Sequence, residues 1–581
     1  MRTAGVFVFL LLNVVMEITG AVDNTKGSSS EKSSPKNKLK TEEAELPHTK
    51  PASFSLFLGK LLVVPMDGSH WIGLKAIAQE MGRRGHRVTV VMPETTMRMG
   101  PGKHYETLTY PVPYDKAYID SVMSTHKDIM KKSSQPFMEK IKKRFTQFQA
   151  ISYIPHITAE KLLFNASLIS HLSQQDFDAV LTDPMFPMGS LVARKLGELL
   201  CTQVICLLVH LHIFSPIITQ SLPGLPTVNL LRGIPCYLDM KSAGCPSPPS
   251  YVPRYFTGYT DKMSFKERFI NTLVALVEPL FCKLLYWRFD QIARDFLGEN
   301  VGVAEVLSDS DIWLLRNDFT LDFPRPLMPN IVLVGGINCN VKHPLPPDLD
   351  SWVSGEHGFV VFTLGSMVSD LPEEITSVFL EAFRQIPQKV IWRYTGKVPD
   401  NVPENVKMMK WVPQNDLLAH PGARAFITHA GSHGLFEGLC HAVPMLMVPL
   451  NGDQPDNAAR MASRGVGIVL NILDINTETL LKGLKEVIND SRYKENVKKL
   501  SDLHNDRPSD PLELSVYWTE FVMRHKGAKH LKSTLHELYW FQYFSLDVIV
   551  LLTTVVLVFV MLTAKCMKLC FRKVRRKWKQ E

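Results

Sequence analysis

The sequence predicts an α/β protein with two doubly wound parallel-sheet domains that face each other across a cleft, and one C-terminal transmembrane helix. Short apolar runs alternate with helical patterns in two separate parts of the chain, which is typical of strand–helix–strand units. At 581 residues the chain is too long for a single core. Hydrophobic residues make up 45% and charged residues 21%, so most of the chain should be globular.

The net charge of +8 is concentrated at the C-terminal end. Residues 565–581 carry +7 of it, and residues 60–564 balance to zero. A basic nucleic-acid-binding domain is therefore not expected.

The N-terminal residues 1–20 predict a cleaved signal peptide. Arg2 precedes an apolar run, and small residues end it near Gly20. Residues 21–59 are rich in Ser, Lys and Glu. They offer nothing for a buried N-terminal strand to pack against, so we expect a flexible low-complexity insert.

Residues 546–564 predict one transmembrane helix. The stretch 548–564 has no charge and forms about 26 Å of helix, close to the ~30 Å hydrocarbon core. An aromatic belt precedes it, and the basic tail 565–581 follows it, which predicts a cytosolic tail. Lys577 and Lys579 resemble the dilysine signal of endoplasmic-reticulum membrane proteins. We therefore expect a single-pass type I protein of that membrane, with both domains in the lumen.

The first domain is expected at residues 60–324 and the second at 325–538, with a Pro-rich boundary at 323–326. The first begins with a strand–helix–strand unit, in which a helical pattern at 72–83 joins two apolar runs. The strands expected in the first domain are 61–65, 88–92 and 179–182. Those expected in the second are 331–334, 360–364, 390–394, 425–428 and 445–449. Because they alternate with helices, both sheets should be parallel and covered on both faces.

A long apolar helix pattern at 262–288 allows two interpretations. It is either a core helix of the first domain or a helix that rests partly on the membrane.

The cysteines predict no zinc site, because no metal-like Cys/His spacing occurs. Seven of the nine cysteines are expected in the lumen, so at least one lacks an intramolecular partner. Cys236 and Cys245 flank a Pro-rich loop and could pair. Asn165 and Asn489 begin glycosylation sequons.

The most informative run is 411–454. A glycine-bearing turn after the strand 425–428 opens a helix at about Ser432, and a helix N-terminus offers free N–H groups to a diphosphate. Trp411 can stack on a planar base, and Gln414 and Glu437 can hold ribose hydroxyls. Asp453 and the adjacent Gln454 can bind the hydroxyls of a sugar. Each feature alone has an ordinary structural interpretation, but their order over one short run favours a binding site.

This run resembles the signature of the UDP-glycosyltransferases, and the chain from about Gly59 resembles the vertebrate UDP-glucuronosyltransferases of the phenol-conjugating branch. Segments 334–339 and 362–366 add to the likeness. The resemblance implies a GT-B fold of two Rossmann-like domains, with the UDP-sugar on the C-terminal domain and a lipophilic acceptor on the N-terminal one. It further implies that Trp411 faces the uracil of the donor and that Gln414 and Glu437 face its ribose. The residues implied at the diphosphate are Ser366, His429, Ser432 and Gly434. Asp453 and Gln454 are implied to face the sugar, and Arg316 a glucuronate carboxylate. Two departures are His433, where many members have Asn, and the insert at 21–59.

His70 and Asp183 are the catalytic candidates, since the resemblance places the general base at His70 and its partner at Asp183. Both residues also follow predicted parallel strands, at the sheet edge where such folds bind ligands. Each alone would more often be a helix cap or the end of a strand. As a pair they predict one displacement, in which neutral His70 takes the acceptor's proton and Asp183 balances its charge.

The expected reaction is inverting transfer of glucuronate from UDP-glucuronate, the co-substrate, to small phenols, alcohols or steroids, which become anionic. No cofactor and no metal are expected, because the Asp-x-Asp strings lie in the wrong places. The alternatives are the same reaction with UDP-glucose, UDP-galactose or a UDP-N-acetyl sugar, and a non-catalytic membrane-anchored binding or regulatory subunit. His156, residues 185–188 and residues 221–226 are candidate acceptor-lining positions. The resemblance also implies homo- or hetero-oligomers with related transferases and contact with membrane lipid.

Overall fold

The computed structural model describes residues 57–124, 152–210, 224–233, 238–340, 342–365, 368 and 370–578. The chain forms two compact units, 1–531 and 532–581. The predicted signal peptide, nearly all of the predicted insert and most of the dilysine signal lie outside the described residues. Residues 57–59 are described, and the Gly59 N–H donates to His86 Nδ1 at 3.1 Å.

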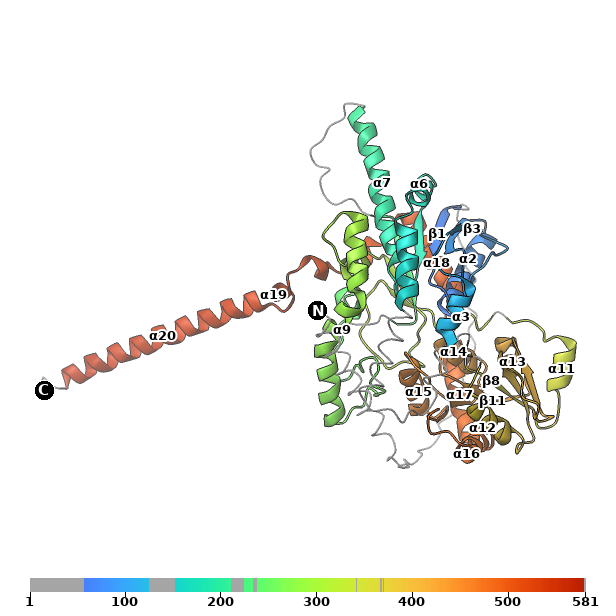
Figure 1. Cartoon of the computed structure of the whole chain (residues 1–581). Coiled ribbons are helices and arrows are strands. Elements are labelled where there is room, and N and C mark those ends of the chain that lie inside the picture. The colour runs from blue at the N-terminus through green and yellow to red at the C-terminus, as the bar shows by residue number, and fades with distance from the viewer. Residues whose placement is uncertain are drawn as a thin grey trace, which may run out of the picture. The chain divides into compact units, whose positions relative to one another are not determined.

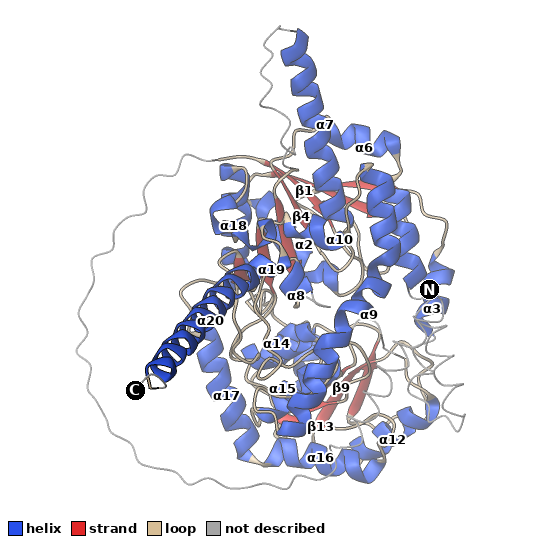
Figure 2. Cartoon of the chain, turned by 90° about the vertical axis from the view of Figure 1, so that its left-hand side faces the viewer, coloured by secondary structure: helices blue, strands red, loops and turns tan. Residues whose placement is uncertain are grey.

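Two parallel sheets organise the first unit, and Figure 2 shows helices around each of them. The first sheet has the order β3-β2-β1-β4-β5-β6-β7, and the second has the order β10-β9-β8-β11-β12-β13. Their strands are β1 Lys60–Val64, β2 Arg87–Pro93, β3 Glu106–Tyr110, β4 Ala179–Thr182, β5 Thr227–Leu231, β6 Ile312–Leu315, β7 Ile331–Leu333, β8 Phe359–Thr363, β9 Lys389–Arg393, β10 Val406–Met409, β11 Ala423–Thr428, β12 Met445–Met447 and β13 Gly467–Val469.

Helices account for most of the remaining described structure of the first unit (Figure 1). They are α2 His70–Arg83, α3 Lys116–Ser124, α6 Ala166–Ser173, α7 Met188–His210, α8 Leu238–Lys241, α9 Phe265–Leu297, α10 Val303–Ser308, α11 Pro347–Val353, α12 Glu373–Phe383, α13 Gln414–Ala419, α14 Ser432–Cys440, α15 Gln454–Ser463, α16 Thr477–Asn489, α17 Ser491–Asn505, α18 Pro511–His525 and the 3-10 turn η1 Lys529–Leu531.

Both faces of the first sheet are covered, as predicted. One core joins alternate strand residues such as Leu61 and Val63 to α2 and α18. The other joins Leu62 and Val64 to α7, α9 and α10. Because side chains alternate along a strand, these apolar runs supply both cores at once.

The second sheet is covered in the same way. Phe362 of β8 packs in one core with residues of α12 and α16, and its ring stacks on Phe379 with centroids 4.6 Å apart. Phe359 and Val361, on the opposite face, pack with residues of α13, α14, α15 and α17.

The structure corrects the place of one predicted strand. Residues 331–334 were expected in the second domain, but β7 pairs in parallel with β6 and ends the first sheet. The helix α18, expected in the second domain, also packs on the first sheet, where it contacts α2. Sheet membership depends on hydrogen bonds to distant strands, which local periodicity does not report.

The second unit contains η2 Thr534–Glu537, α19 Trp540–Tyr543 and α20 Leu546–Lys577. Residues 546–573 of α20 form a helix long and apolar enough to cross a membrane, and none of its most apolar window is buried. This agrees with the predicted span at 546–564.

Candidate active site

His70 and Asp183 are hydrogen-bonded, although 113 residues separate them in the chain. His70 is the first residue of α2, after β1, and Asp183 directly follows the adjacent strand β4. His70 Nδ1 lies 2.7 Å from Asp183 Oδ2. The other oxygen, Oδ1, accepts from the Met185 N–H at 2.9 Å. The Asp183 side chain is 1% exposed and that of His70 is 25% exposed, so the carboxylate is held inside and the ring reaches the surface of the site.

A polar contact joins this dyad to the second sheet. His433, the second residue of α14, has Nε2 3.0 Å from the carbonyl oxygen of Ser69, next to His70. The same nitrogen contacts Nη1 of Arg316, which follows β6. Desolvation, together with the nearby Arg316 guanidinium, holds the pKa of His433 well below its usual value. The ring is therefore neutral at pH 7, and its Nε2 can accept from Arg316 or donate to Ser69, but not both.

Helix α14 begins at Ser432, as predicted, and Gly431 precedes it. The ring of His429 fits between Gly365 and Gly431, because a Cβ at either glycine would lie 2.4 Å from a ring atom. Gly365 also has a φ of 78°, which favours glycine. Burial lowers the pKa of His429 to about 4, so this ring is neutral near pH 7. Its Nδ1 has no hydrogen-bond partner among the described residues.

Trp411 is 62% exposed and has two arginines close to its ring. The guanidinium carbon of Arg98, from the first half of the chain, is 5.5 Å from its ring centroid, and that of Arg393, at the end of β9, is 5.7 Å away. Burial, with Arg98 nearby, lowers the pKa of Arg393 to about 10, so Arg393 keeps its charge at pH 7. An exposed aromatic ring with guanidinium groups nearby can bind a planar ring that carries an anion.

Gln414 and Glu437 form a polar pair beside Trp411. Gln414 Nε2 donates to Glu437 Oε2 at 2.6 Å, and its Oε1 accepts from Thr363. Burial raises the pKa of Glu437 to about 7. The two side chains, predicted for one ribose, therefore already lie together.

Asp453 is held by a buried hydrogen-bond network that the sequence did not predict. Asn457 Nδ2 donates to Asp453 Oδ2 at 2.8 Å and to the Ala430 carbonyl at 3.1 Å. Asn457 Oδ1 accepts from Arg232 Nη2, at the end of β5, at 2.8 Å. Asn457 is fully buried, so this network links the first sheet to the loop that carries Asp453.

Gln454, the first residue of α15, uses its side-chain oxygen within the chain. Its Oε1 accepts from the backbone N–H groups of Leu450 and Asn451 at 2.8 and 3.0 Å. It therefore stabilises the loop before α15, and only its Nε2, 3.2 Å from Asn451 Oδ1, keeps donor capacity.

Four guanidinium groups, those of Arg232, Arg316, Arg325 and Arg393, keep an unused donor among the described residues. The unused donor is the Nε N–H in each case. Arg232 and Asp453 line one cavity of about 60 Å³, and Arg316, Ser432 and Glu437 line another of about 10 Å³. Buried cations with unused N–H groups favour an anionic ligand between the two sheets.

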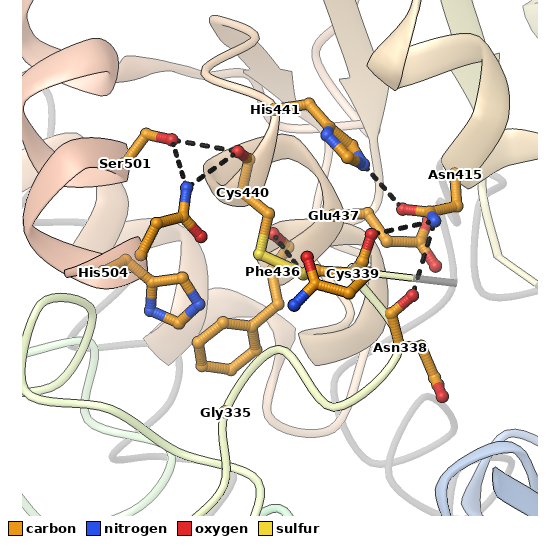
Figure 3. Close-up of a disulfide and its surroundings, with 12 residues drawn as sticks. Gly335, Asn338, Cys339, Asn415, Phe436, Glu437, Cys440, His441, Ser501 and His504 are labelled. Carbon is orange, nitrogen blue, oxygen red and sulfur yellow. Dashed lines mark hydrogen bonds between the residues drawn. A yellow bond between two sulfur atoms is a disulfide. The ribbon is translucent and has the colours of Figure 1, made fainter. Parts of the chain in front are cut away.

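A disulfide ties the segment after β7 to α14 (Figure 3). It joins Cys339 to Cys440 across 101 residues. Asn415, next to Gln414, faces the same segment and contacts the carbonyls of Asn338 and Cys339 at 3.4 and 3.3 Å. Among the described residues, the one group spaced for a metal ion is Cys339, Cys440 and His504, and its two sulfurs are used by this disulfide.

The cysteines correct a second expectation. Cys245 is a buried free thiol, so the suggested pair with Cys236 does not form. Cys236 itself lies outside the described residues.

The remaining predicted positions vary. Ser366 and residues 221–223 lie outside the described part of the chain. His156 packs in the core with its ring 4.6 Å from that of Phe289, and Phe186, within the candidate stretch 185–188, stacks on the same ring at 5.5 Å. Asn165 caps α6 by accepting from the Leu168 N–H at 3.0 Å, and Asn489 is exposed at the end of α16.

The sequence matches a family model described as "UDP-glucoronosyl and UDP-glucosyl transferase" over residues 59–210 and 202–581. The chain belongs to this family. UDP-glucuronosyltransferase 1A1 of Rattus norvegicus is 44% identical over 510 residues, covering 87% of this chain and 90% of that protein. UDP-glucuronosyltransferase 1A1 of Homo sapiens is 43% identical over 518 residues, covering 89% and 92%. The chain is therefore a glycosyltransferase enzyme of the UDP-glucuronosyltransferase type.

Solved structures confirm the fold of this family member. The spinosyn forosaminyltransferase SpnP aligns with a TM-score of 0.52 at 16% identity, covering 81% of this chain and all of that one. The glycosyltransferase VinC, in complex with dTDP, aligns with a TM-score of 0.51 at 18% identity, covering 80% and 100%. The predicted GT-B arrangement of two parallel-sheet domains is confirmed.

Sequence reasoning missed Arg393, Asn457 and Arg232, although signals for two of them existed. Arg393 ends a strand at the same sheet edge as the other site residues. Asn457 stands one helical turn after Asp453, a spacing that brings two side chains together. Arg232 follows a strand that the sequence did not predict.

Proposed function

We propose that this enzyme transfers glucuronate from UDP-glucuronate to hydroxyl groups of small lipophilic acceptors, with inversion. The observation that supports this most is the His70–Asp183 pair, which lies beside the N-terminus of α14 through the His433–Ser69 contact. The first-sheet half would bind the acceptor, and the second-sheet half would bind the UDP-sugar.

His70 acts as the general base through Nε2, because Nδ1 faces Asp183. The acceptor oxygen attacks the anomeric carbon as its proton moves to Nε2, and the bond from that carbon to the UDP oxygen breaks. Asp183 stabilises the imidazolium that forms and fixes the ring. The oxygen attacks from the side opposite UDP, so an α-linked donor gives a β-linked product.

UDP leaves toward the N–H groups at the start of α14. His429 donates a hydrogen bond there and does not supply a positive charge, because its pKa is about 4. Positive charge comes instead from Arg393, between Trp411 and the carbonyl of Gly365.

The uracil is placed on Trp411, the ribose at Gln414 and Glu437, and the sugar at Asp453. In this proposal Ser432, Gly434 and Ser366 contact the diphosphate, and Gln454 contributes to the contact with the sugar. Arg316, with its unused Nε, is the candidate for the glucuronate carboxylate. A neutral hexose would leave this cation unpaired, which favours UDP-glucuronate over the neutral UDP-sugars.

We propose the endoplasmic-reticulum membrane as the location, with α20 as a single type I span and both domains in the lumen. Asn489 is the better glycan acceptor, because it is exposed and Asn165 is used as a helix cap. Oligomers with the same chain or related transferases remain an expectation of the family resemblance. Metal independence is a further proposal, and a clear loss of activity after EDTA dialysis would contradict it.

The test is product formation by membranes that carry the full chain, with a simple phenol and a panel of UDP-sugars. We expect conjugation with UDP-glucuronate and its loss in a His70→Ala variant that still binds UDP. A preference for a neutral UDP-sugar would refute the donor assignment. An active His70→Ala variant would refute the base.

A further inference from the structure

Helix α9 carries two apolar faces, and only one of them is buried. The buried face includes Val274, and it includes Tyr286, Phe289 and Ile292, which pack in one core with residues of the first sheet. The other face is exposed to an unusual degree, with Phe265 at 77% and Leu276 at 70%. A helix that is apolar all round is normally buried in a core or in lipid.

The exposed face is one continuous stripe. At 100° per residue, its members fall within an arc of roughly 80° on the side opposite the buried residues. They are Phe265, Phe269, Leu273, Leu276, Leu280 and Trp287. Figure 1 shows α9 along the outer edge of the first unit, and the six side chains are between 45% and 77% exposed. We call these six residues the α9 stripe.

Cations lie on and near the α9 stripe. Lys266, Arg268, Lys283 and Arg288 are all exposed on the same helix. At 100° per residue, Lys283 falls within the arc of the stripe and Lys266 falls just beyond its edge. Of the two acids in this stretch, Glu267 caps the helix N-terminus and Glu278 is buried against Arg254. An apolar stripe that carries long Lys and Arg side chains and ends in Trp suits the boundary between the acyl chains and the headgroups of a bilayer.

The chain itself brings a bilayer within reach. The α20 helix can span a membrane. Residues 532–545 separate it from the first unit and, at ~3.5 Å per residue, extend at most about 50 Å. The linker therefore keeps the first unit close to the membrane at high effective concentration, so a modest apolar area is enough for contact.

We propose that the α9 stripe rests in the interface of the bilayer that anchors the chain, as a second membrane contact of the enzyme. This inference rests on the proposed membrane anchor and not on the proposed chemistry. The α9 helix also carries the core of the acceptor half, since Phe289 and Tyr286 reach Phe186 and the Met185 carbonyl beside Asp183. Contact of the α9 stripe with the bilayer would place the acceptor-binding half of the enzyme next to the membrane, in which lipophilic acceptors dissolve.

The test uses the full chain reconstituted in phosphatidylcholine vesicles that contain a phosphatidylcholine with a photoreactive diazirine in its acyl chain. After irradiation, adducts are mapped by mass spectrometry. We expect adducts on the α9 stripe and none on Val274 or Phe289 of the same helix. The α20 span is the internal control for labelling.

A Phe269→Glu/Leu276→Glu variant should lose at least about fivefold of the α9 adducts while those on α20 stay unchanged, because carboxylates are expelled from the acyl layer. Gln385→Glu, at an exposed position two residues after the end of α12, is the matched control and should label like the unchanged chain. UDP binding by all three proteins establishes that they are folded.

Three results would overturn the inference. The first is an unlabelled α9 stripe beside a labelled α20. The second is labelling of the stripe that stays the same in the Phe269→Glu/Leu276→Glu variant, because such labelling would not depend on the apolar face. The third is an unlabelled α20, which would remove the membrane anchor and the inference with it. None of these results depends on turnover. A failure of the proposed reaction would appear in the product-formation assay and not in the labelling experiment.

Discussion

The two sheets place their site residues in different ways. On the second sheet nearly all candidates come from the single run 411–454, through β11, α14, β12 and the start of α15. On the first sheet His70, Asp183 and Arg316 come from the ends of three strands that are far apart in the chain. Parallel strands bring their carboxyl ends to one edge whatever the sequence distance, so both arrangements produce one site.

The electrostatic states differ as well. Burial keeps His429 and His433 of the second sheet neutral and raises the pKa of Glu437, so that side binds through hydrogen bonds and arginine charge. The first sheet keeps a carboxylate against an imidazole that reaches the site surface. In the proposed function, binding and proton transfer belong to separate sheets, so substitutions on the two sheets should have separable effects.

Asp183→Asn should have the largest effect. An asparagine would keep the Met185 contact through its oxygen and turn its NH₂ toward His70 Nδ1, which moves the ring proton to Nε2 and removes the base. We expect kcat to fall by about 10²–10⁴-fold with UDP affinity unchanged. Steady-state kinetics and UDP calorimetry measure the two quantities. A parallel loss of UDP affinity would mean that the two sheets are not separable in this way.

Breaking the disulfide with Cys339→Ser and Cys440→Ser should lower stability next most. The bond closes a loop of 101 residues, and the chain-entropy model assigns such loops roughly 2–5 kcal/mol. Thermal unfolding of the full chain in detergent should show a lower Tm for the double variant. Cys566→Ser, at an exposed free thiol, is the control and should leave the Tm unchanged. An unchanged Tm in the double variant would show that the segment after β7 stays packed on α14 without this disulfide.

Asn457→Ala should weaken the contact between the sheets at Asp453. It removes the hydrogen bonds to Asp453 and Arg232. We expect the KM for the UDP-sugar to rise about 5–20-fold, with little change in the affinity for UDP alone, which lacks the sugar. Asn496→Ala, which removes a hydrogen bond to Gly465 outside the site, is the matched control. Equal losses for UDP and UDP-sugar would place Asp453 away from the sugar.

Glu437→Gln should have the smallest effect, visible as a pH dependence. The pKa of Glu437 rises from 4.5 to about 7 on folding because burial disfavours the charged form. The folded chain therefore holds a proton that the unfolded chain has released, and stability falls as pH rises from about 4.5 to about 7. The Tm of the variant minus that of the unchanged chain should increase over this range and level off above it. Parallel Tm curves would contradict the raised pKa.

Much of the architecture was predictable from local pattern. The strand at 179–182 and the start of α14 at Ser432 appear at the predicted residues, and the predicted first helix, 72–83, lies within α2. These features depend on hydrophobic periodicity and on glycine turns, and both signals come from residues close together in the sequence. The His70–Asp183 pair was predictable because two strand ends on one sheet edge must come close.

Other features were not predictable for a physical reason. The strand β7 looks like any short apolar run, and only its hydrogen bonds to β6 assign it to the first sheet. The Cys339–Cys440 bond and the Asn457–Arg232 contact join positions 101 and 225 residues apart. No local pattern encodes such partners, because the pairing depends on how the finished sheets meet.

The sequence by itself determined the α/β class, the membrane-spanning segment and the chemical types of the site residues, because composition and short-range periodicity carry that information. The tertiary structure alone decided which of those residues touch, which ones burial keeps neutral, and that one apolar face of α9 stays uncovered. Burial and proximity arise only when distant segments pack, and pKa values and exposed surfaces follow from that packing.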